Sequence, residues 1–284
     1  MLRYLTIHRN LMAPLDPIEP FPWFLQKHLD LQNPEVPANT VISATEWSEH
    51  WRPLLAEILE RFQKKRPHRF MVGIAGPPGV GKTIFAEQLN WLVFKGVIGR
   101  DARSMALPMD GFHFPQDLLK ATTKKLPDGT EIHLSSLKGA PETFDVPAFR
   151  HAMQELIGRP EVVSWPGYSR FHHDVQPGKY RVHESTNLVF VEGNYVLLDR
   201  GLWQGIPRMF DLKIYIQGPA MKVLSNLMER HIKGGKSVEE AKLWVKKIDL
   251  VNTRIVESTK ASADVIIEKN HDDDIVSVTW REAQ

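Results

Sequence analysis

The segment that starts at residue 76 constrains this chain most, because it matches the phosphate-binding pattern G-x-x-x-x-G-K-[ST] at every required position. Glycines let the backbone curl so that successive N–H groups point at phosphate oxygens. Lys82 would bring a positive charge to the β- and γ-phosphates of a nucleotide, and the hydroxyl of Thr83 would ligate Mg²⁺. The nucleotide-binding residues that this pattern predicts are Gly76, Pro77, Pro78, Gly79, Val80, Gly81, Lys82 and Thr83.

The residues on both sides of this loop favour nucleotide binding over a purely structural glycine turn. Residues 70–75 form a short apolar run, which predicts a buried strand before the loop. After the loop, apolar side chains recur at helical spacing at Ile84, Phe85, Leu89, Leu92 and Val93. A strand that leads through a glycine loop into a helix directs the N–H groups and the dipole of that helix at an anion.

The composition of the 284 residues limits the classes of protein to consider. Hydrophobic residues make up 42% and charged residues 25%, which is typical of a globular protein. A net charge of only +2 gives no general field for nucleic acid or an anionic membrane, and no apolar run is long enough to cross a bilayer. Without cysteine the chain has no disulfide, thiolate metal site or cysteine nucleophile. We therefore expect a cytoplasmic protein, without a cleaved signal, that binds a small molecule and neither nucleic acid nor a membrane.

Two parts are predicted along the chain. Residues 13–37 contain six prolines and little periodicity, which predicts an extended arm over the surface. Residues 43–62 show capping-box spacing and one apolar helical face, and Pro53 must bend or start that helix. We therefore assign residues 1–66 to an N-terminal extended arm and helix, and residues 67–284 to the domain that contains the phosphate-binding loop.

Beyond the loop, apolar strands alternate with helices. Further strands are predicted at residues 105–109, 162–165, 188–191, 212–216 and 265–267, the last of which would close the sheet. Helices are predicted at residues 147–156, after Pro219, and from residue 237, where a capping box begins, to about residue 258. The alternation predicts an α/β fold of the P-loop NTPase class, with a mostly parallel sheet, helices on both faces and an N-terminal helical arm.

Two acidic side chains should lie at the same edge of the sheet as the loop, because each directly follows a strand. Asp110 ends the strand at 105–109, and Glu192 ends the strand at 188–191. Open parallel sheets bind ligands at the carboxyl ends of their strands. A carboxylate there could be only a helix cap or turn residue, but beside a phosphate loop a role as base or metal ligand is favoured. We expect Asp110 to accept the proton of a substrate hydroxyl, and Glu192 to orient Mg²⁺ or its waters or to hold the substrate.

Missing motifs narrow the class of nucleotide-binding protein. The chain has no Asn-Lys-x-Asp motif of guanine-reading GTPases and no Leu-Ser-Gly-Gly signature of transporter ATPases. Its apolar strand ends in Glu192 alone rather than in the Asp-Glu pair of most helicases. A small-molecule kinase remains.

Four segments together resemble the phosphoribulokinase/uridine kinase/pantothenate kinase family of P-loop kinases. They are residues 76–83, 109–113, 138–145 and 191–193. The likeness runs from about Phe70 to Glu268 and is closest to bacterial members labelled nucleoside/nucleotide kinase-like or fructose-transport-associated kinase. It implies that the domain at 67–284 is a kinase domain, which uses ATP and Mg²⁺ to phosphorylate a hydroxyl group.

The resemblance also implies roles for single residues. Asp110 stands in the position of the family's catalytic aspartate, and Glu192 in that of its second acidic residue. Arg230 falls where the lid of the family supplies an arginine to the phosphates; alternatively, it is a cation at the C-terminal end of a helix. The implied catalytic residues are thus Lys82, Asp110, Glu192 and Arg230, and the implied metal ligands are Thr83 and Glu192.

Substrate contacts are implied for four further residues. Tyr168 and Arg170 lie where relatives carry a substrate loop with a tyrosine and an arginine, although a turn beside Pro166 and Gly167 is the alternative. His113 and Lys138 belong to two of the shared segments. We therefore expect His113, Lys138, Tyr168 and Arg170 to bind the substrate.

The acceptor is less well defined than the reaction. The loop signature of pantothenate kinases is not reproduced around Pro77, and Ser169 stands where nucleoside kinases often have aspartate. We expect a small hydroxylated metabolite (a sugar, a sugar acid or a pantothenate-like molecule), with a uridine-kinase-type nucleoside kinase as the alternative. A nucleotide-binding regulatory protein without turnover is the alternative from another class. The oligomeric state, including a homodimer, is open.

Overall fold

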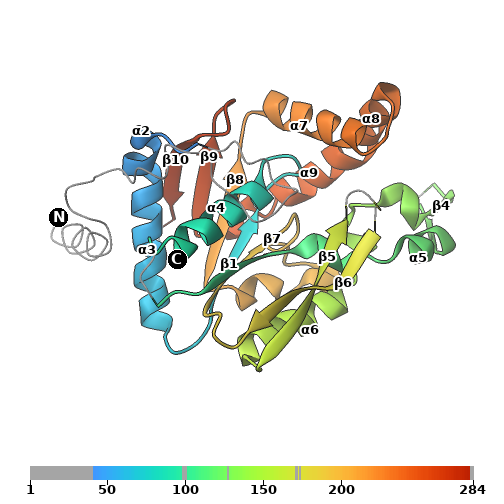
Figure 1. The fold of residues 1–284 in the computed structure, drawn as a ribbon. Coiled ribbons are helices and arrows are strands. Elements are labelled where there is room, and N and C mark those ends of the chain that lie inside the picture. The colour runs from blue at the N-terminus through green and yellow to red at the C-terminus, as the bar shows by residue number, and fades with distance from the viewer. Residues whose placement is uncertain (1–40, 98–100, 127, 170–171, 173, 282–284) are drawn as a thin grey trace.

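The computed structural model describes residues 41–97, 101–126, 128–169, 172 and 174–281. Within these ranges a six-stranded sheet has the strand order β10-β9-β8-β1-β7-β2 (Figure 1). Its strands are β1 (Phe70–Ala75), β2 (Ser104–Pro108), β7 (Leu188–Glu192), β8 (Leu212–Gln217), β9 (Val265–Lys269) and β10 (Ile275–Trp280). The arm predicted at residues 13–37 lies outside the described residues, and the division of the chain after residue 66 stays a prediction.

The sheet is mostly parallel, as the sequence predicts. β1 is buried along its whole length and pairs in parallel with β7 and β8, while β2 and β9 extend the sheet on either side. The expectation that residues 265–267 close the sheet is wrong, because β10 pairs with β9 in antiparallel fashion at this edge. Two antiparallel strands can be connected by a tight turn, whereas parallel strands need a longer crossover. The side-chain oxygen of Asn270 forms this turn by accepting hydrogen bonds from the amides of Asp272 and Asp274.

Helices cover both faces of the sheet and bury two apolar clusters. On one face, α3 (Arg52–Lys65) and α4 (Lys82–Phe94) pack on side chains such as Val72, Ile214 and Ile267. On the other face, α6 (Val146–Gly158) and α9 (Leu250–Glu257) join a cluster that includes Met71 and Tyr215. Strands between two helical layers must be apolar on both faces, which is why β7 is buried along its whole length.

The N-terminal helical segment packs directly against the sheet. It runs from α2 (Ala44–Glu46) through a π-helical turn at Trp47–Trp51 into α3, in which Pro53 occupies the first turn. Proline lacks an N–H and crowds the preceding turn, so a widened turn immediately before it keeps the segment helical. Trp47 and Trp51 are fully buried in the same cluster as β1 and β9.

Two hairpins lie outside the central sheet. A turn at Asp128 and Gly129 lies between β3 (Thr123–Lys125) and β4 (Glu131–His133), beside α5 (Gln116–Ala121). The strand predicted at 162–165 is longer than expected and does not join the central sheet. It is β5 (Val162–Ser169), which pairs with β6 (Asp174–His183). The indole Nε1 of Trp165 donates a 2.9 Å hydrogen bond to the carbonyl of Pro108, which fixes this hairpin to the end of β2.

The segment after β8 is helical and projects from the sheet. It comprises α7 (Ala220–Lys233), α8 (Val238–Trp244), a π-helical turn at Val245–Asp249, and α9 (Figure 1). The predicted capping box is present, because Ser237 and Glu240 each accept the other's backbone N–H. In Figure 1, α7 and α8 lie at the same end of the molecule as α5 and β4.

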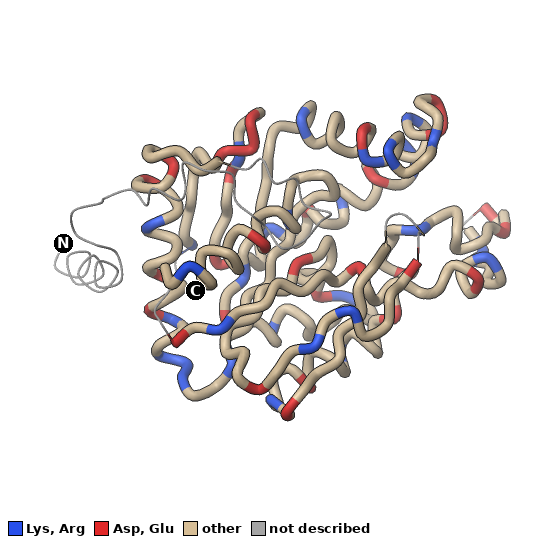
Figure 2. Tube along the Cα trace, in the orientation of Figure 1, with Lys and Arg blue, Asp and Glu red and all other residues tan. Residues whose placement is uncertain are grey.

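Charged residues are spread over the described trace. Figure 2 shows lysine and arginine interspersed with aspartate and glutamate along most elements. Among the described residues, no helix combines the length and the apolar character needed to span a membrane.

Candidate active site

The predicted phosphate-binding loop connects β1 to α4 and adopts backbone conformations that only glycine takes readily. Gly79 and Gly81 have φ values of 84° and 87°, in the left-handed region. A Cβ atom on Gly76 would stand 2.4 Å from the carbonyl oxygen of Ile216 on β8. The tight curl between β1 and α4 therefore needs glycine at these positions for conformational and for steric reasons.

Lys82, the first residue of α4, is 7% exposed. Its Nζ donates hydrogen bonds of 2.9 Å and 3.0 Å to the carbonyl oxygens of Gly76 and Pro77. The ammonium thus lies across the base of the loop, where it adds positive charge to the N-terminus of the helix.

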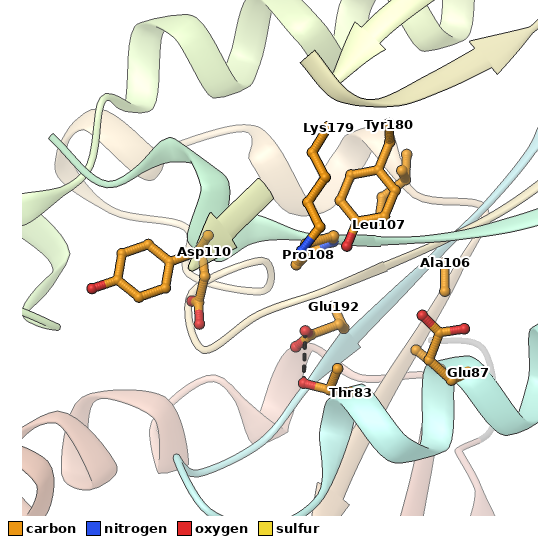
Figure 3. Close-up of a pocket in the computed structure, with 11 residues that line it drawn as sticks. Thr83, Glu87, Ala106, Leu107, Pro108, Asp110, Lys179, Tyr180 and Glu192 are labelled. Atoms are coloured by element: carbon orange, nitrogen blue, oxygen red, sulfur yellow. Dashed lines mark hydrogen bonds between the residues drawn. The ribbon is translucent and has the colours of Figure 1, made fainter. Parts of the chain in front are cut away.

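Thr83 and Glu192 come together from two different elements. The Thr83 Oγ1 in the first turn of α4 donates a 2.9 Å hydrogen bond to Oε1 of Glu192, the last residue of β7 (Figure 3). Glu192 is 7% exposed. The pair places a hydroxyl and a carboxylate side by side, and these are oxygen ligands of the kind that Mg²⁺ prefers.

Asp110 lies in a 3₁₀ turn (Met109–Phe112) directly after β2. This turn packs so closely on β5 that a Cβ atom on Gly111 would stand 2.2 Å from the carbonyl oxygen of Pro166. Asp110, Thr83 and Glu192 line the same pocket (Figure 3). The structure therefore brings the two predicted acidic residues and the hydroxyl of the loop to one site.

Three polar side chains of this pocket were not predicted from the sequence. Lys179 and Tyr180 come from β6, and Glu87 comes from α4. The stem of Lys179 lies against Gly167, where a Cβ atom would stand 2.3 Å from its Cδ. Figure 3 shows the Lys179 side chain reaching from β6 toward Pro108. The dipeptide Pro166-Gly167 was the only signal for this contact, and it did not point to residue 179.

The predicted substrate residues His113, Lys138 and Tyr168 form a second group beside Asp110. The His113 ring stacks on Phe144 at 3.9 Å between centroids and lies 5.5 Å from the ring of Tyr168. The Lys138 Nζ lies 5.2 Å from the centroid of the same tyrosine ring. Tyr168 also lines the pocket and therefore connects this group with Asp110.

Burial lowers the pKa of two members of this group. Loss of solvation lowers the pKa of His113 to about 4, although the negative charge of Asp110 opposes this shift. Burial also lowers the pKa of Lys138, against the opposing effects of Asp174 and Asp110. Around neutral pH the His113 ring is therefore uncharged and can serve as a neutral hydrogen-bonding group.

Two predicted residues lie apart from this pocket or outside the described chain. Arg230, near the end of α7, has its Nη2 3.7 Å from Oδ1 of Asp249. Oδ2 of the same carboxylate lies 2.7 Å from Nε2 of His231. Arg230 thus belongs to the projecting helices and does not line the pocket of Asp110. Arg170 lies outside the described residues.

The oxygen atoms of Thr83 and Glu192 are of a kind that fits Mg²⁺. No group of three or more histidine, cysteine, aspartate or glutamate side chains in the described part of the chain could hold a metal ion by itself. Mg²⁺ is usually held by one or two protein oxygens together with water and substrate phosphates. Thr83 and Glu192 would supply such oxygens next to the loop.

The chain is similar in sequence to several curated proteins. No protein-family model matches the chain. The "Uncharacterized protein YggC" of Escherichia coli K12 is 32% identical over 221 residues, which cover 76% of this chain and 85% of that protein. The "Putative uridine kinase C227.14" of Schizosaccharomyces pombe is 26% identical over 214 residues, which cover 72% of this chain and 85% of that protein.

This chain is also similar to pantothenate kinases and to a kinase of known structure. The pantothenate kinase of Bacillus subtilis is 29% identical over 177 residues, or 58% of this chain, but the match spans only 52% of the length of that protein. The crystal structure of a "putative fructose transport system kinase" from Silicibacter sp. TM1040 has a TM-score of 0.62 and 29% identity, over 72% of this chain and 93% of that one. The fold, the loop and these relatives agree: this chain belongs to the phosphoribulokinase/uridine kinase/pantothenate kinase family of P-loop kinases.

Proposed function

We propose that this protein transfers the γ-phosphate of Mg·ATP to a hydroxyl group of a small metabolite. One observation carries the proposal: Thr83, Glu192 and Asp110 line one pocket at the N-terminus of α4. A metal-binding pair beside the phosphate loop and a carboxylate facing the same space are the parts that phosphoryl transfer to an alcohol requires.

Each residue has a distinct task in the proposed reaction. The N–H groups of the loop and the ammonium of Lys82 hold the β- and γ-phosphates. Asp110 accepts the proton of the acceptor hydroxyl as its oxygen forms a bond to the γ-phosphorus. The bond from that phosphorus to the β-γ bridging oxygen breaks, and ADP leaves. Mg²⁺, held by Thr83 and Glu192, would neutralise negative charge on the phosphates.

We propose a sugar, a sugar acid or a pantothenate-like molecule as the acceptor. Tyr168, Tyr180 and Lys179 line the pocket with groups that can bind hydroxyls or an acid group. Ser169 is 6% exposed, and its hydroxyl accepts a 3.1 Å hydrogen bond from the amide of His172. This hydroxyl is therefore used within the hairpin, which favours a sugar-like acceptor over a nucleoside.

An ADP-release assay tests the proposal. The wild-type protein, with ATP and Mg²⁺, is offered a panel of sugars, sugar acids, pantothenate and nucleosides. We expect release to rise with one class of acceptor and Asp110→Asn to lower kcat by about 10²- to 10⁴-fold, with nearly unchanged ATP affinity. Asp101→Asn is a matched control, because Asp101 is exposed and lies before β2, at the opposite end of this strand from Asp110.

The outcomes separate the alternatives. Stimulation by nucleosides alone would assign a nucleoside kinase. ATP binding without stimulation by any acceptor would instead support a regulatory nucleotide-binding protein. Near-normal turnover by Asp110→Asn would refute the role of Asp110 as the base.

A further inference from the structure

A buried lysine ends β9 beside the phosphate-binding loop. Side chains of a strand alternate between its faces, and Lys269 shares a face with Val265 and Ile267, which pack into the apolar cluster of α3 and α4. Lys269 is only 4% exposed. An ammonium at a position where the pattern calls for an apolar side chain is unfavourable, because the charge loses its hydration.

The described residues give the Lys269 ammonium neither a hydrogen bond nor an ion pair, so it is stabilised only by more distant charges. Asp273 and Glu46 are the acidic residues that affect it most. Asp273 lies 3.1 Å from Nζ of Lys222, and Glu46 accepts a 2.9 Å hydrogen bond from the indole of Trp51. Each of these carboxylates therefore already has a partner of its own. Burial lowers the pKa of Lys269 in spite of them.

The Lys269 side chain ends at the loop itself. A Cβ atom on Gly81 would stand 3.0 Å from its Nζ, so the ammonium lies against the loop backbone at the residue that precedes Lys82. Gly81 is also the N-cap of α4, a helix of 13 residues. The N-terminus of a helix attracts anions, and a buried cation without a counter-charge next to it strengthens that attraction.

We propose that Lys269 is a second basic residue of the nucleotide site, and that its ammonium binds the phosphate chain of the nucleotide beside Gly81. This inference rests on the proposed function in one respect, because it requires that a nucleotide binds at the loop. Lys82 provides one charge from within α4, and Lys269 provides another from the end of β9. A phosphate oxygen would supply the charged hydrogen-bond partner that the buried ammonium lacks among the described residues.

The replacement Lys269→Met tests this role, because methionine fills a similar volume without a charge. Two quantities are measured: the melting temperature without nucleotide, and the Kd of Mg·ADP and of Mg·tripolyphosphate. We expect an unchanged or higher melting temperature, since a buried charge is removed. Both ligands should bind about 10- to 100-fold more weakly, as expected for the loss of a charged hydrogen bond.

Lys213→Met is the matched control. Lys213 lies near the N-terminal end of β8, the strand next to β9, whereas Lys269 lies at the C-terminal end of β9. The Nζ of Lys213 is 3.1 Å from Asp264. This variant removes the same charge, and its affinity for both ligands should equal that of the wild type.

Three results would overturn the inference. The first is equal Mg·ADP binding by Lys269→Met and the wild type. The second is weaker binding of Mg·ADP with unchanged binding of tripolyphosphate, which would place Lys269 on the nucleoside part. The third is a lower melting temperature without nucleotide, which would make Lys269 a structural support of the loop. Wild-type protein that binds no ADP would remove the proposed function as well, so the two failures can be told apart.

Discussion

The hydroxyl of Thr83 donates a 2.9 Å hydrogen bond to the carboxylate of Glu192, and thereby joins the first turn of α4 to the end of β7. The two strands that lead to this bond, β1 and β7, are hydrogen-bonded neighbours in a buried parallel pair. The position of the bond is therefore set by two neighbouring strands that are buried along their whole length. If this pair binds Mg²⁺, as we propose, the site needs little rearrangement when a nucleotide binds.

The first prediction concerns Glu192. Glu192→Gln keeps an oxygen that can accept the hydrogen bond from Thr83 but removes the negative charge that would attract Mg²⁺. We expect kcat to fall about 10- to 100-fold, and the Mg²⁺ concentration for half-maximal activity to rise. Titration of activity with Mg²⁺ measures both effects. Thr83→Ser, which keeps the hydroxyl, is the control; an unchanged Mg²⁺ requirement in Glu192→Gln would exclude Glu192 from the metal site.

The second prediction concerns the close packing behind Asp110. In Gly111→Ala the new methyl group would meet the carbonyl of Pro166 at 2.2 Å, so the backbone that carries Asp110 must move. We expect a loss of about 1–3 kcal/mol in the free energy of unfolding, together with a lower kcat. Gly158→Ala at the end of α6 is the control, because nothing lies within 4 Å of its Cβ position. Denaturant unfolding should show this control to be slightly stabilised. Equal stability of the two variants would contradict the prediction.

The sequence predicts the parts of the fold that depend on local pattern. β7 was predicted from an unbroken apolar run at residues 188–191, and the structure places it at Leu188–Glu192. The edge strand β10 was missed because its alternating residues are only partly buried and follow an acidic turn. β6 was missed because Pro177 and Gly178 suggest a loop, although they lie within one strand of the hairpin with β5.

In the candidate site, too, the residues that follow a local sequence pattern were predicted, and those that depend on tertiary packing were not. Asp110 and Glu192 were predicted because each ends a strand next to the phosphate loop. The contribution of Lys179 depends on how the β5–β6 hairpin folds over the end of β2, and no local pattern encodes that contact. For the same reason the motifs predict the reaction better than the acceptor.

The third prediction concerns this hairpin. Lys179→Met keeps the stem that packs on Gly167 and removes the ammonium from the pocket. If Lys179 binds the acceptor, the KM of the acceptor should rise about tenfold while the KM of ATP is unchanged. Arg181→Met removes a charge two residues further along β6, outside the pocket, and should change neither value. An unchanged KM of the acceptor in Lys179→Met would remove Lys179 from the binding site.

The fourth prediction is a dependence of stability on pH. The pKa of His113 is about 4 in the folded protein and 6.5 in an ordinary environment. Between these values the unfolded chain binds more protons, so the folded protein gains stability as the pH rises from 4 to 6.5 and loses it as the pH falls. We expect wild type to lose up to about 3 kcal/mol relative to His113→Gln across this window. Urea unfolding of both proteins at several pH values measures the difference; a constant difference would contradict the uncharged state of the partly buried His113.

The last prediction concerns Arg230, which is either the arginine of the lid or only a cation at the end of α7. The Asp249 carboxylate contacts both Arg230 and His231, so it can hold the arginine in place. If Arg230 acts on the phosphates, Arg230→Met should lower kcat by about 10²-fold or more, because a charge on the transferring group is lost. Asp249→Asn should then lower kcat less, and the double variant should match Arg230→Met alone, since Asp249 would act only through the arginine. Normal turnover in Arg230→Met, with a loss of less than about 1 kcal/mol in stability, would identify Arg230 as a helix-end cation.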